Sequence, residues 1–246
     1  MKKILFYFLT IAAFVFASCS SKENLAIITA DELSPMQVGK VFIYRLDSTV
    51  LANFNQSLVV HSYIAKDSIE SKFNDGSGRT SFRIFRYLTD TLQTKPWQYT
   101  ATYYSTTDNN TIEYIDNNLR FVSLVSPVRA GVQWKGTQYI NSISPSPFSY
   151  FSNWNFEYQN ADEPFLTKKG IIQNTYTIFQ QDETLPDIPF STNNYQEKSF
   201  SKEVYAKGIG LIYKEFIRWT YQPPTAVNKY FQEGSFGIKL NLIDYK

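Results

Sequence analysis

The side chains that most often carry out chemistry are scarce in this chain. Among 246 residues there is one histidine, His61, and one cysteine, Cys19. Nucleophilic hydrolysis needs a serine or cysteine beside a base, and a zinc site needs several Cys or His ligands. The sequence also lacks a Gly-x-Ser-x-Gly elbow, a phosphate-binding loop and a dinucleotide fingerprint. His61 lies in a run typical of a strand. We therefore expect a structural role for it, and no catalytic residue, metal or cofactor.

Paired acids are the remaining route to catalysis, because glycoside hydrolysis needs only two carboxyl groups roughly 5–9.5 Å apart. Strand alternation puts Glu215 on one face with the aromatic and aliphatic side chains of residues 211–221. Arg86 has the same relation to Phe82 and Ile84. A lone charge on an apolar face needs a partner. We predict that Arg86 and Glu215 both point inward and pair. A structural ion pair is favoured, and a ligand-binding pair stays open.

Aromatic side chains are the other candidates for binding. Residues 145–154 contain two prolines and four rings, Phe148, Tyr150, Phe151 and Trp154. Flat rings bind apolar faces with little loss of entropy, so this loop is a candidate platform for a sugar or for a membrane. Trp97, at the start of a predicted strand, is a further candidate. The alternative, which we favour, is that the rings of the loop plug one end of the sheet.

These residues must be positioned by strands. Hydrophobic residues make up 43% of the chain and charged residues 19%, which indicates a packed globule, and the 17% of aromatic residues favours strands. After residue 30 no stretch of a dozen residues has helical spacing of apolar side chains. Alternating runs predict strands at residues 39–49, 57–66, 80–89, 97–105, 111–115, 119–126, 132–141, 171–179, 199–207, 209–221 and 235–245.

The connections between these runs predict the fold. Turn signals such as Asp75-Gly76 and Asn117-Asn118 separate neighbouring runs and favour sequential hairpins. About eleven strands without covering helices must bury one face against the sheet itself or against a second sheet. We therefore predict one all-β domain made of a strongly curved antiparallel sheet, a barrel or half-barrel. A sandwich of two sheets is the alternative.

The N-terminus predicts export. Lys2 and Lys3 precede residues 4–16, which carry no charge and are too few for a membrane-spanning helix. Ala17 and Ser18 then lead into Cys19. This arrangement resembles the lipobox of bacterial lipoproteins, in which the cysteine is acylated and the peptide is cleaved before it, although Phe16 stands where Leu or Val is more usual. An ordinary secretory signal is the alternative.

This resemblance divides the chain into a signal peptide (1–18), a lipidated cysteine and tether (19–36) and the all-β domain (37–246). Cleavage before Cys19 removes two lysines and leaves 24 − 2 = 22 basic against 22 acidic residues. A chain without net charge is not steered toward nucleic acid. The acylated Cys19 would anchor the protein to a membrane. We expect the outer membrane, with the periplasmic and the surface face both open.

Longer segments carry a second resemblance. Residues 78–84, 134–136 and 237–240, and above all residues 203–215, resemble a family of uncharacterised lipoproteins of the Bacteroidota. The likeness spans most of the chain after the signal. It implies a location in the cell envelope and no particular activity.

Three tripeptides are similar to the Asp-(Ser/Thr)-small or aliphatic acceptor motif of O-glycosylation in the same bacterial group. They place candidate acceptors at Ser48, Ser68 and Thr91. The motif is short, so chance matches are expected, and we expect one of the three to be used at most.

Two function classes remain, with a third behind them. The leading one is a lipid-anchored, non-catalytic module that binds a small apolar or glycan ligand, or an accessory subunit of an outer-membrane assembly. The alternative is a protein-interaction scaffold with a filled core. A ligand carrier should have a cavity of roughly 300 Å³ or more between the sheet faces, and a scaffold should not. A carboxylate-dependent glycan hydrolase is the third possibility. Glycan, lipid and envelope protein are thus the partners to test.

Overall fold

The computed structural model describes residues 27–108, 110–225 and 230–246, and these residues form strands almost throughout. The strands are β1 (Val41–Ala52), β2 (Ser57–Asn74), β3 (Thr80–Thr89), β4 (Gln98–Asp108), β5 (Thr111–Asp116), β6 (Leu119–Val125), β7 (Gln133–Trp134), β8 (Phe156–Thr167), β9 (Gly170–Leu185), β10 (Gln196–Ala206), β11 (Gly210–Gln222), β12 (Tyr230–Phe231) and β13 (Phe236–Tyr245). The helices described are α2 (Ala30–Leu33) and the 3-10 turn η1 (Ser149–Phe151). None in this part of the chain is long and apolar enough to cross a membrane.

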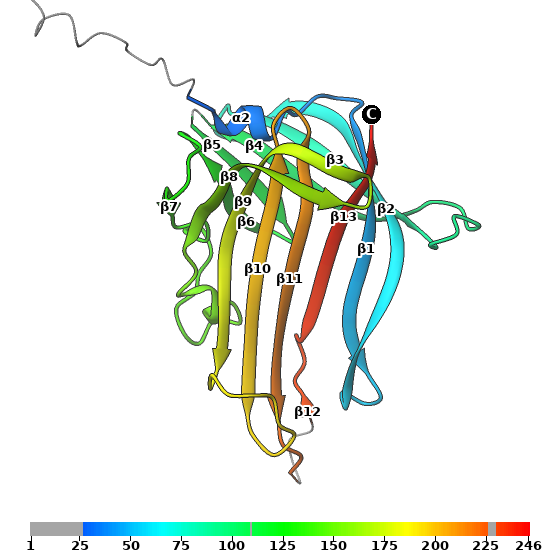
Figure 1. Cartoon of the computed structure of the whole chain (residues 1–246), viewed down its shortest axis with the longest axis vertical. Coiled ribbons are helices and arrows are strands. Elements are labelled where there is room, and N and C mark those ends of the chain that lie inside the picture. The colour runs from blue at the N-terminus through cyan, green and yellow to red at the C-terminus, as the bar shows by residue number, and fades with distance from the viewer. Residues whose placement is uncertain (1–26, 109, 226–229) are drawn as a thin grey trace, which may run out of the picture.

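The strands form a single antiparallel sheet in which neighbours in sequence mostly pair. Its order is β6-β5-β4-β3-β2-β1-β13-β11-β10-β9-β8-β7, with β12 beside β11. Asn117 and Asn118 take the positive φ that their tight turn requires, so this hairpin forms where the sequence predicts it. Pairing of β1 with β13 brings the two ends of the domain together in the middle of the sheet (Figure 1). The predicted all-β, strongly curved antiparallel sheet is confirmed.

The two ends of the sheet meet at a seam and make the sheet a nearly closed barrel. The amide of Val122 on β6 donates to the carbonyl of Gly136 at 2.8 Å, just after β7. The indole Nε1 of Trp134 donates to the Val122 carbonyl at 2.7 Å. The Tyr158 hydroxyl of β8 donates to the carbonyl of Val125 at 2.8 Å and accepts from its amide at 3.1 Å. These bonds satisfy backbone groups that an open sheet edge would leave unpaired.

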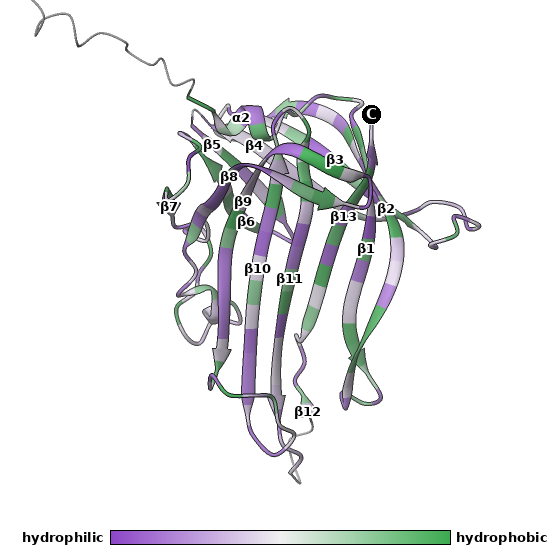
Figure 2. Ribbon diagram, in the orientation of Figure 1, coloured by the Kyte–Doolittle hydropathy of each residue, from purple (hydrophilic) through white to green (hydrophobic). Residues whose placement is uncertain are grey.

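Alternation along the strands builds the core. Figure 2 shows hydrophobic and hydrophilic residues alternating along β10, β11 and β13. On β13, Leu240 and Leu242 are buried, whereas Lys239 is exposed. The hairpin of β8 and β9 crosses the outside of β10, β11 and β13 (Figure 1). Phe165 of this hairpin packs on Tyr213 of β11 with the ring centroids 5.2 Å apart, so the outer face of β11 is covered as well.

Two strand predictions differ from the structure. Of the run at 132–141, only β7 is a strand, and β8 falls where none was predicted. The pairing of β8 with β9 shifts register three times, after Tyr158, after Ala161 and after Glu163. Each bulge adds a residue and breaks the period of two that marks a strand in a sequence. The sequence of β8 therefore lacks the regular alternation that predicts a strand.

The predicted tether also differs in its last part. Within it, α2 buries Ala30 and Leu33, which are 2% and 0% exposed. The Ala30 amide donates to the Ser126 hydroxyl at 2.9 Å, and Glu32 pairs with Lys207 at 2.8 Å. α2 thus packs across one end of the barrel (Figure 1), and the folded domain begins before residue 37. The signal peptide, Cys19 and the start of the predicted tether lie outside the described residues.

Candidate functional site

Arg86 is buried in the barrel, but its partner is Asp67. The guanidinium donates to both carboxylate oxygens, Nε to Oδ1 at 2.6 Å and Nη2 to Oδ2 at 2.5 Å. Arg86 and Asp67 are 6% and 7% exposed, and the guanidinium lies 4.7 Å from the ring centroid of Tyr103. Burial by itself would lower the pKa of Arg86, but the charge of Asp67 outweighs it and raises that pKa. The pairing of β2 with β3 places the two residues directly opposite each other.

Glu215 does not pair with Arg86, which corrects the prediction. A bulge leaves Ile212 without a partner on β10, because Tyr205 pairs with Leu211 and Val204 with Tyr213. The bulge reverses the alternation, so Lys214 lines the interior cavities and Glu215 faces outward. There Glu215 accepts a hydrogen bond from the Tyr213 hydroxyl and lies 3.7 Å from Lys239.

The barrel interior is polar in its middle. Glu203 pairs with Lys214 at 2.9 Å and accepts from the Tyr205 hydroxyl at 2.9 Å. Burial raises the pKa of Tyr205 and raises the pKa of Tyr103 to about 12. The Tyr44 hydroxyl, in the same interior, donates to the Leu211 carbonyl at 2.9 Å. Each of these charges and hydroxyls has a partner, which is what burial of a polar group requires.

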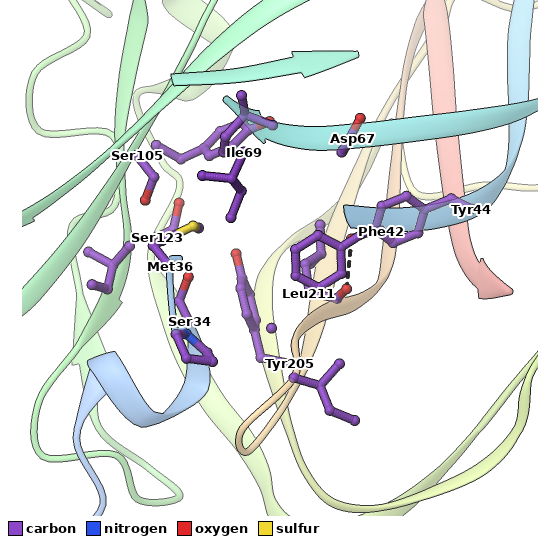
Figure 3. A pocket seen from close by; sticks show the side chains of 16 residues that line it. Ser34, Met36, Phe42, Tyr44, Asp67, Ile69, Ser105, Ser123, Tyr205 and Leu211 are labelled. Atoms are coloured by element: carbon purple, nitrogen blue, oxygen red, sulfur yellow. Dashed lines mark hydrogen bonds between the residues drawn. The ribbon is translucent and has the colours of Figure 1, made fainter. Parts of the chain in front are cut away.

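Three small cavities lie in the interior of the described part of the barrel. The first, of about 50 Å³, is lined by Ser34, Met36, Phe42, Ser105 and Tyr205 among others (Figure 3). Two more of about 40 Å³ each follow it along the interior. A water molecule needs about 10–15 Å³ by this measure, so each cavity has room for a few waters. These volumes are far below the roughly 300 Å³ expected of a ligand carrier.

The aromatic loop contains two buried rings and two half-buried ones. Phe151 and Trp154 are 2% and 1% exposed, and their rings pack together with centroids 4.7 Å apart. They also border the third interior cavity, so they plug the barrel there. Phe148 and Tyr150 are half-buried. Trp97 lies elsewhere, just before β4, and stacks with Lys66 of β2. The ligand-binding role of these rings stays a prediction.

A concave polar feature lies beside this loop. A groove of about 300 Å³ runs between the loop and strands β9 to β11. It is lined by Ser149, Tyr150, Ser152, Asn153, Glu183, Leu185, Glu197, Ser199 and Arg218. Ser199 is paired across β10 with Glu183 on one side and with Arg218 on the other. Because directly opposite residues share a face, these three side chains form one row across three strands.

Arg218 is the unusual member of the groove. Its guanidinium lies 4.3 Å from the ring centroid of Tyr150. Unlike Arg86, it forms no ion pair or hydrogen bond with any residue that the structure describes. Burial raises the pKa of Tyr150, and the charge of Arg218 opposes that rise. The groove therefore presents a cation, placed over a ring, whose five N–H donors are free for a ligand.

Sequence reasoning missed Glu183, Glu197 and Arg218. Glu183 and Glu197 lie outside the predicted strand runs, and Arg218 lies within the run at 209–221, where no neighbouring residue singles it out. Only the register of β9, β10 and β11 brings them into one groove. The run of aromatic residues did point to the loop that forms the opposite wall.

The candidate glycosylation residues and His61 are half-buried or exposed. Ser48 and Ser68 are half-buried inside β1 and β2, whereas Thr91 is exposed in the connection between β3 and β4. The carboxylate of Asp90 accepts from the amides of Leu92 and Lys95, which fixes that connection. His61 is an exposed residue of β2. Within the described ranges, no group of three or more His, Cys, Asp or Glu side chains could hold a metal ion.

Comparison with known proteins leaves the family open. No protein-family model matches the sequence, and no curated protein matches it. A candidate exported protein of Bacteroides fragilis with a YmcC-like fold aligns over 87% of this chain and 98% of its own, at 9% identity and a TM-score of 0.45. A candidate lipoprotein of Parabacteroides distasonis aligns over the same shares, at 10% identity and a TM-score of 0.38. Similarity at this level assigns neither a function nor a location to the chain.

Proposed function

We propose that this chain is a lipid-anchored protein of the cell envelope that binds a saccharide in the groove between the aromatic loop and β9 to β11. The observation that supports the proposal is that Arg218 has no ion pair among the described residues. Its guanidinium contacts the Tyr150 ring and borders a groove of about 300 Å³. The interior cavities, at about 50 Å³ or less, do not support transport of an apolar ligand inside the barrel.

The lining of the groove suits sugar hydroxyls. A hydroxyl group both donates and accepts hydrogen bonds. Glu183 and Glu197 can accept from it, Arg218 can donate to it, and Ser199 can do either. Charge-assisted hydrogen bonds of this kind are about twice as strong as neutral ones. Glu197 also accepts a hydrogen bond from the Tyr195 hydroxyl. A saccharide can bond to the guanidinium of Arg218, which a purely apolar ligand would leave unpaired.

The anchor is proposed from the sequence alone. Acylation of Cys19 would attach the chain near α2, at the end of the barrel opposite the connection between β9 and β10 (Figure 1). A groove away from the attached end would stay accessible to a ligand in the envelope. Cys19→Ser should release the protein into the soluble fraction of the envelope, as measured by fractionation and by loss of metabolic labelling with palmitate. Unchanged membrane association of this variant would contradict the anchor.

The groove is tested by binding to the folded domain in solution. The probes are glucose, galactose, mannose, xylose and N-acetylglucosamine, together with their oligosaccharides of two to six rings, measured by calorimetry. Loss of charge-assisted hydrogen bonds should weaken binding of the best probe about tenfold or more in Arg218→Ala. Arg83→Ala is the matched control, because the exposed Arg83 also lies over a ring, that of Phe73, but on β3. The absence of binding to every probe, or equal binding by both variants, would overturn the proposal.

Hydrolysis of a glycan is the second candidate function. Glu183 and Glu197 lie on neighbouring strands and are diagonal neighbours, because Ser199 and Leu185 are their direct partners. Diagonal neighbours lie on the same face of a sheet with Cβ atoms somewhat less than about 7–8 Å apart, so both carboxyl groups can face one ligand, as paired catalytic acids must. The proposal is for binding without cleavage. Release of shorter products from an oligosaccharide, abolished in Glu183→Gln, would favour the hydrolase instead.

A further inference from the structure

The row of groove residues continues onto a fourth strand. Arg218 on β11 is directly opposite Phe236, the first residue of β13. Phe236 shares a face with Ile238 and Leu240, which line an interior cavity, because side chains alternate along the strand. Glu183, Ser199, Arg218 and Phe236 therefore lie in one line across β9, β10, β11 and β13. At about 4.8 Å between strands, this line is on the order of 14 Å long.

The ring of Phe236 is supported on one side and open on the other. It stacks on Phe216 with centroids 4.9 Å apart and planes at 24°, and Phe216 in turn packs on the buried Trp154 at 5.9 Å. Phe236 nevertheless remains 38% exposed, so part of its ring is open to solvent.

The backbone next to Phe236, at Gly237, is closely packed. At Gly237 an added Cβ would lie 3.1 Å from the Cβ of Thr49 and 3.2 Å from the carbonyl oxygen of Phe216. β13 therefore packs against β1 and β11 at this point with no space for a side chain at residue 237. A ring held on a rigid strand loses little entropy when a ligand stacks on it.

We propose that Phe236 forms a second subsite of the groove and that the ligand is an oligosaccharide of at least two rings, lying across the strands. One sugar ring bonds to Glu183, Ser199 and Arg218, and the next stacks its apolar face on Phe236. This inference rests on the proposed saccharide-binding function and adds the length and the direction of the ligand. A single ring cannot reach both ends of a line of about 14 Å.

The test compares ligand length in two variants. The probes are the best-binding monosaccharide of the panel above and its oligosaccharides of two to six rings. The wild-type chain should bind the longer probes about tenfold more tightly than the monosaccharide. Phe236→Ala should remove most of that gain, about five- to tenfold, and leave binding of the monosaccharide unchanged, because only the second ring loses its stacking partner. Phe236→Trp should keep or increase the gain.

Two controls separate the outcomes. Phe190→Ala removes another half-exposed ring, which packs on Trp219. Trp219 follows Arg218 in the sequence, so Trp219 and Phe190 lie on the opposite face of β11 from the groove. It should leave every affinity unchanged. Urea unfolding of each variant shows that the fold is retained. An equal dependence on ligand length in Phe236→Ala and wild type would overturn the second subsite while leaving the groove intact. Absence of binding by the wild-type chain to any probe would overturn both.

Discussion

The buried pair of Arg86 and Asp67 gives the sharpest test of the structure. Both residues are less than one-tenth exposed and share two hydrogen bonds of 2.6 and 2.5 Å. At an effective dielectric constant of about 20, two charges about 4 Å apart attract each other by roughly 4 kcal/mol. Removing one partner also leaves the other charge buried and unpaired, and such losses are typically about 3–5 kcal/mol. Asp67→Asn should therefore lower the free energy of unfolding by about 3–5 kcal/mol.

The matched control is Glu215→Gln, which makes the same acid-to-amide change on the outer face. Glu215 is about one-third exposed and lies 3.7 Å from Lys239, so its loss should cost less than about 1 kcal/mol. An Arg86–Glu215 pair, as expected from strand alternation, predicts the reverse order of the two variants. The comparison thus tests the bulge at Ile212, which turns Glu215 away from Arg86.

The assay is urea unfolding followed by tryptophan fluorescence and circular dichroism, with a linear extrapolation to water. Typical domains have about 5–15 kcal/mol of stability in total, so the effect of Asp67→Asn is a large fraction of it. The double variant Asp67→Leu with Arg86→Met should lose less stability than either single change, because no charge stays unpaired. A loss below about 1 kcal/mol in Asp67→Asn, or simple additivity in the double variant, would refute the reasoning.

Two further predictions follow from the seam and from the interior. Gly136→Ala should lower the free energy of unfolding by about 1–3 kcal/mol, because the added Cβ would lie 2.2 Å from the Phe156 ring, beside the hydrogen bond that closes the barrel. Gly76→Ala is the control. An added Cβ there has nothing within 4 Å, so the same urea assay should show a change of less than about 0.5 kcal/mol. Burial raises the pKa of Tyr103 to about 12, so the folded chain holds this proton more tightly than the unfolded chain, whose tyrosines titrate near pH 10. The protonated Tyr103 should therefore contribute fully to the free energy of unfolding below about pH 10, and this contribution should be lost between about pH 10 and 12. A urea midpoint that stays constant between these pH values would contradict this.

Several features of the fold could be predicted because they depend on local chemistry. The run at residues 80–89 is rich in aromatic and β-branched residues, follows a turn with two glycines, and coincides with β3. The turn at Asn117 and Asn118 needs only residues that tolerate a positive φ. The expectation that rings of the aromatic loop would fill one end of the sheet agrees with the burial of Phe151 and Trp154. Each of these features depends either on interactions between residues close in the sequence or on the amount of apolar surface that the chain must bury.

The candidate site could not be predicted in the same way. Glu215 was assigned to the wrong face because a bulge adds one residue to β11 and reverses the alternation after it. Leu211, Ile212 and Tyr213 at this bulge include no glycine, the residue that most often marks a bulge in a sequence. The partners of Arg218 depend on how β9, β10, β11 and β13 are aligned, and a shift of one residue in any pair would break the row.

The sequence by itself thus determined the class of fold, the hairpin turns and the scarcity of nucleophiles and metal ligands, since these depend on composition, on period and on local backbone preferences. Only the tertiary structure decided that the barrel is filled, that Arg86 pairs with Asp67, and that Glu183, Ser199, Arg218 and Phe236 stand in one line. The physical reason is that strand register is set by the packing of the whole sheet. It joins residues up to dozens of positions apart that share no local signal.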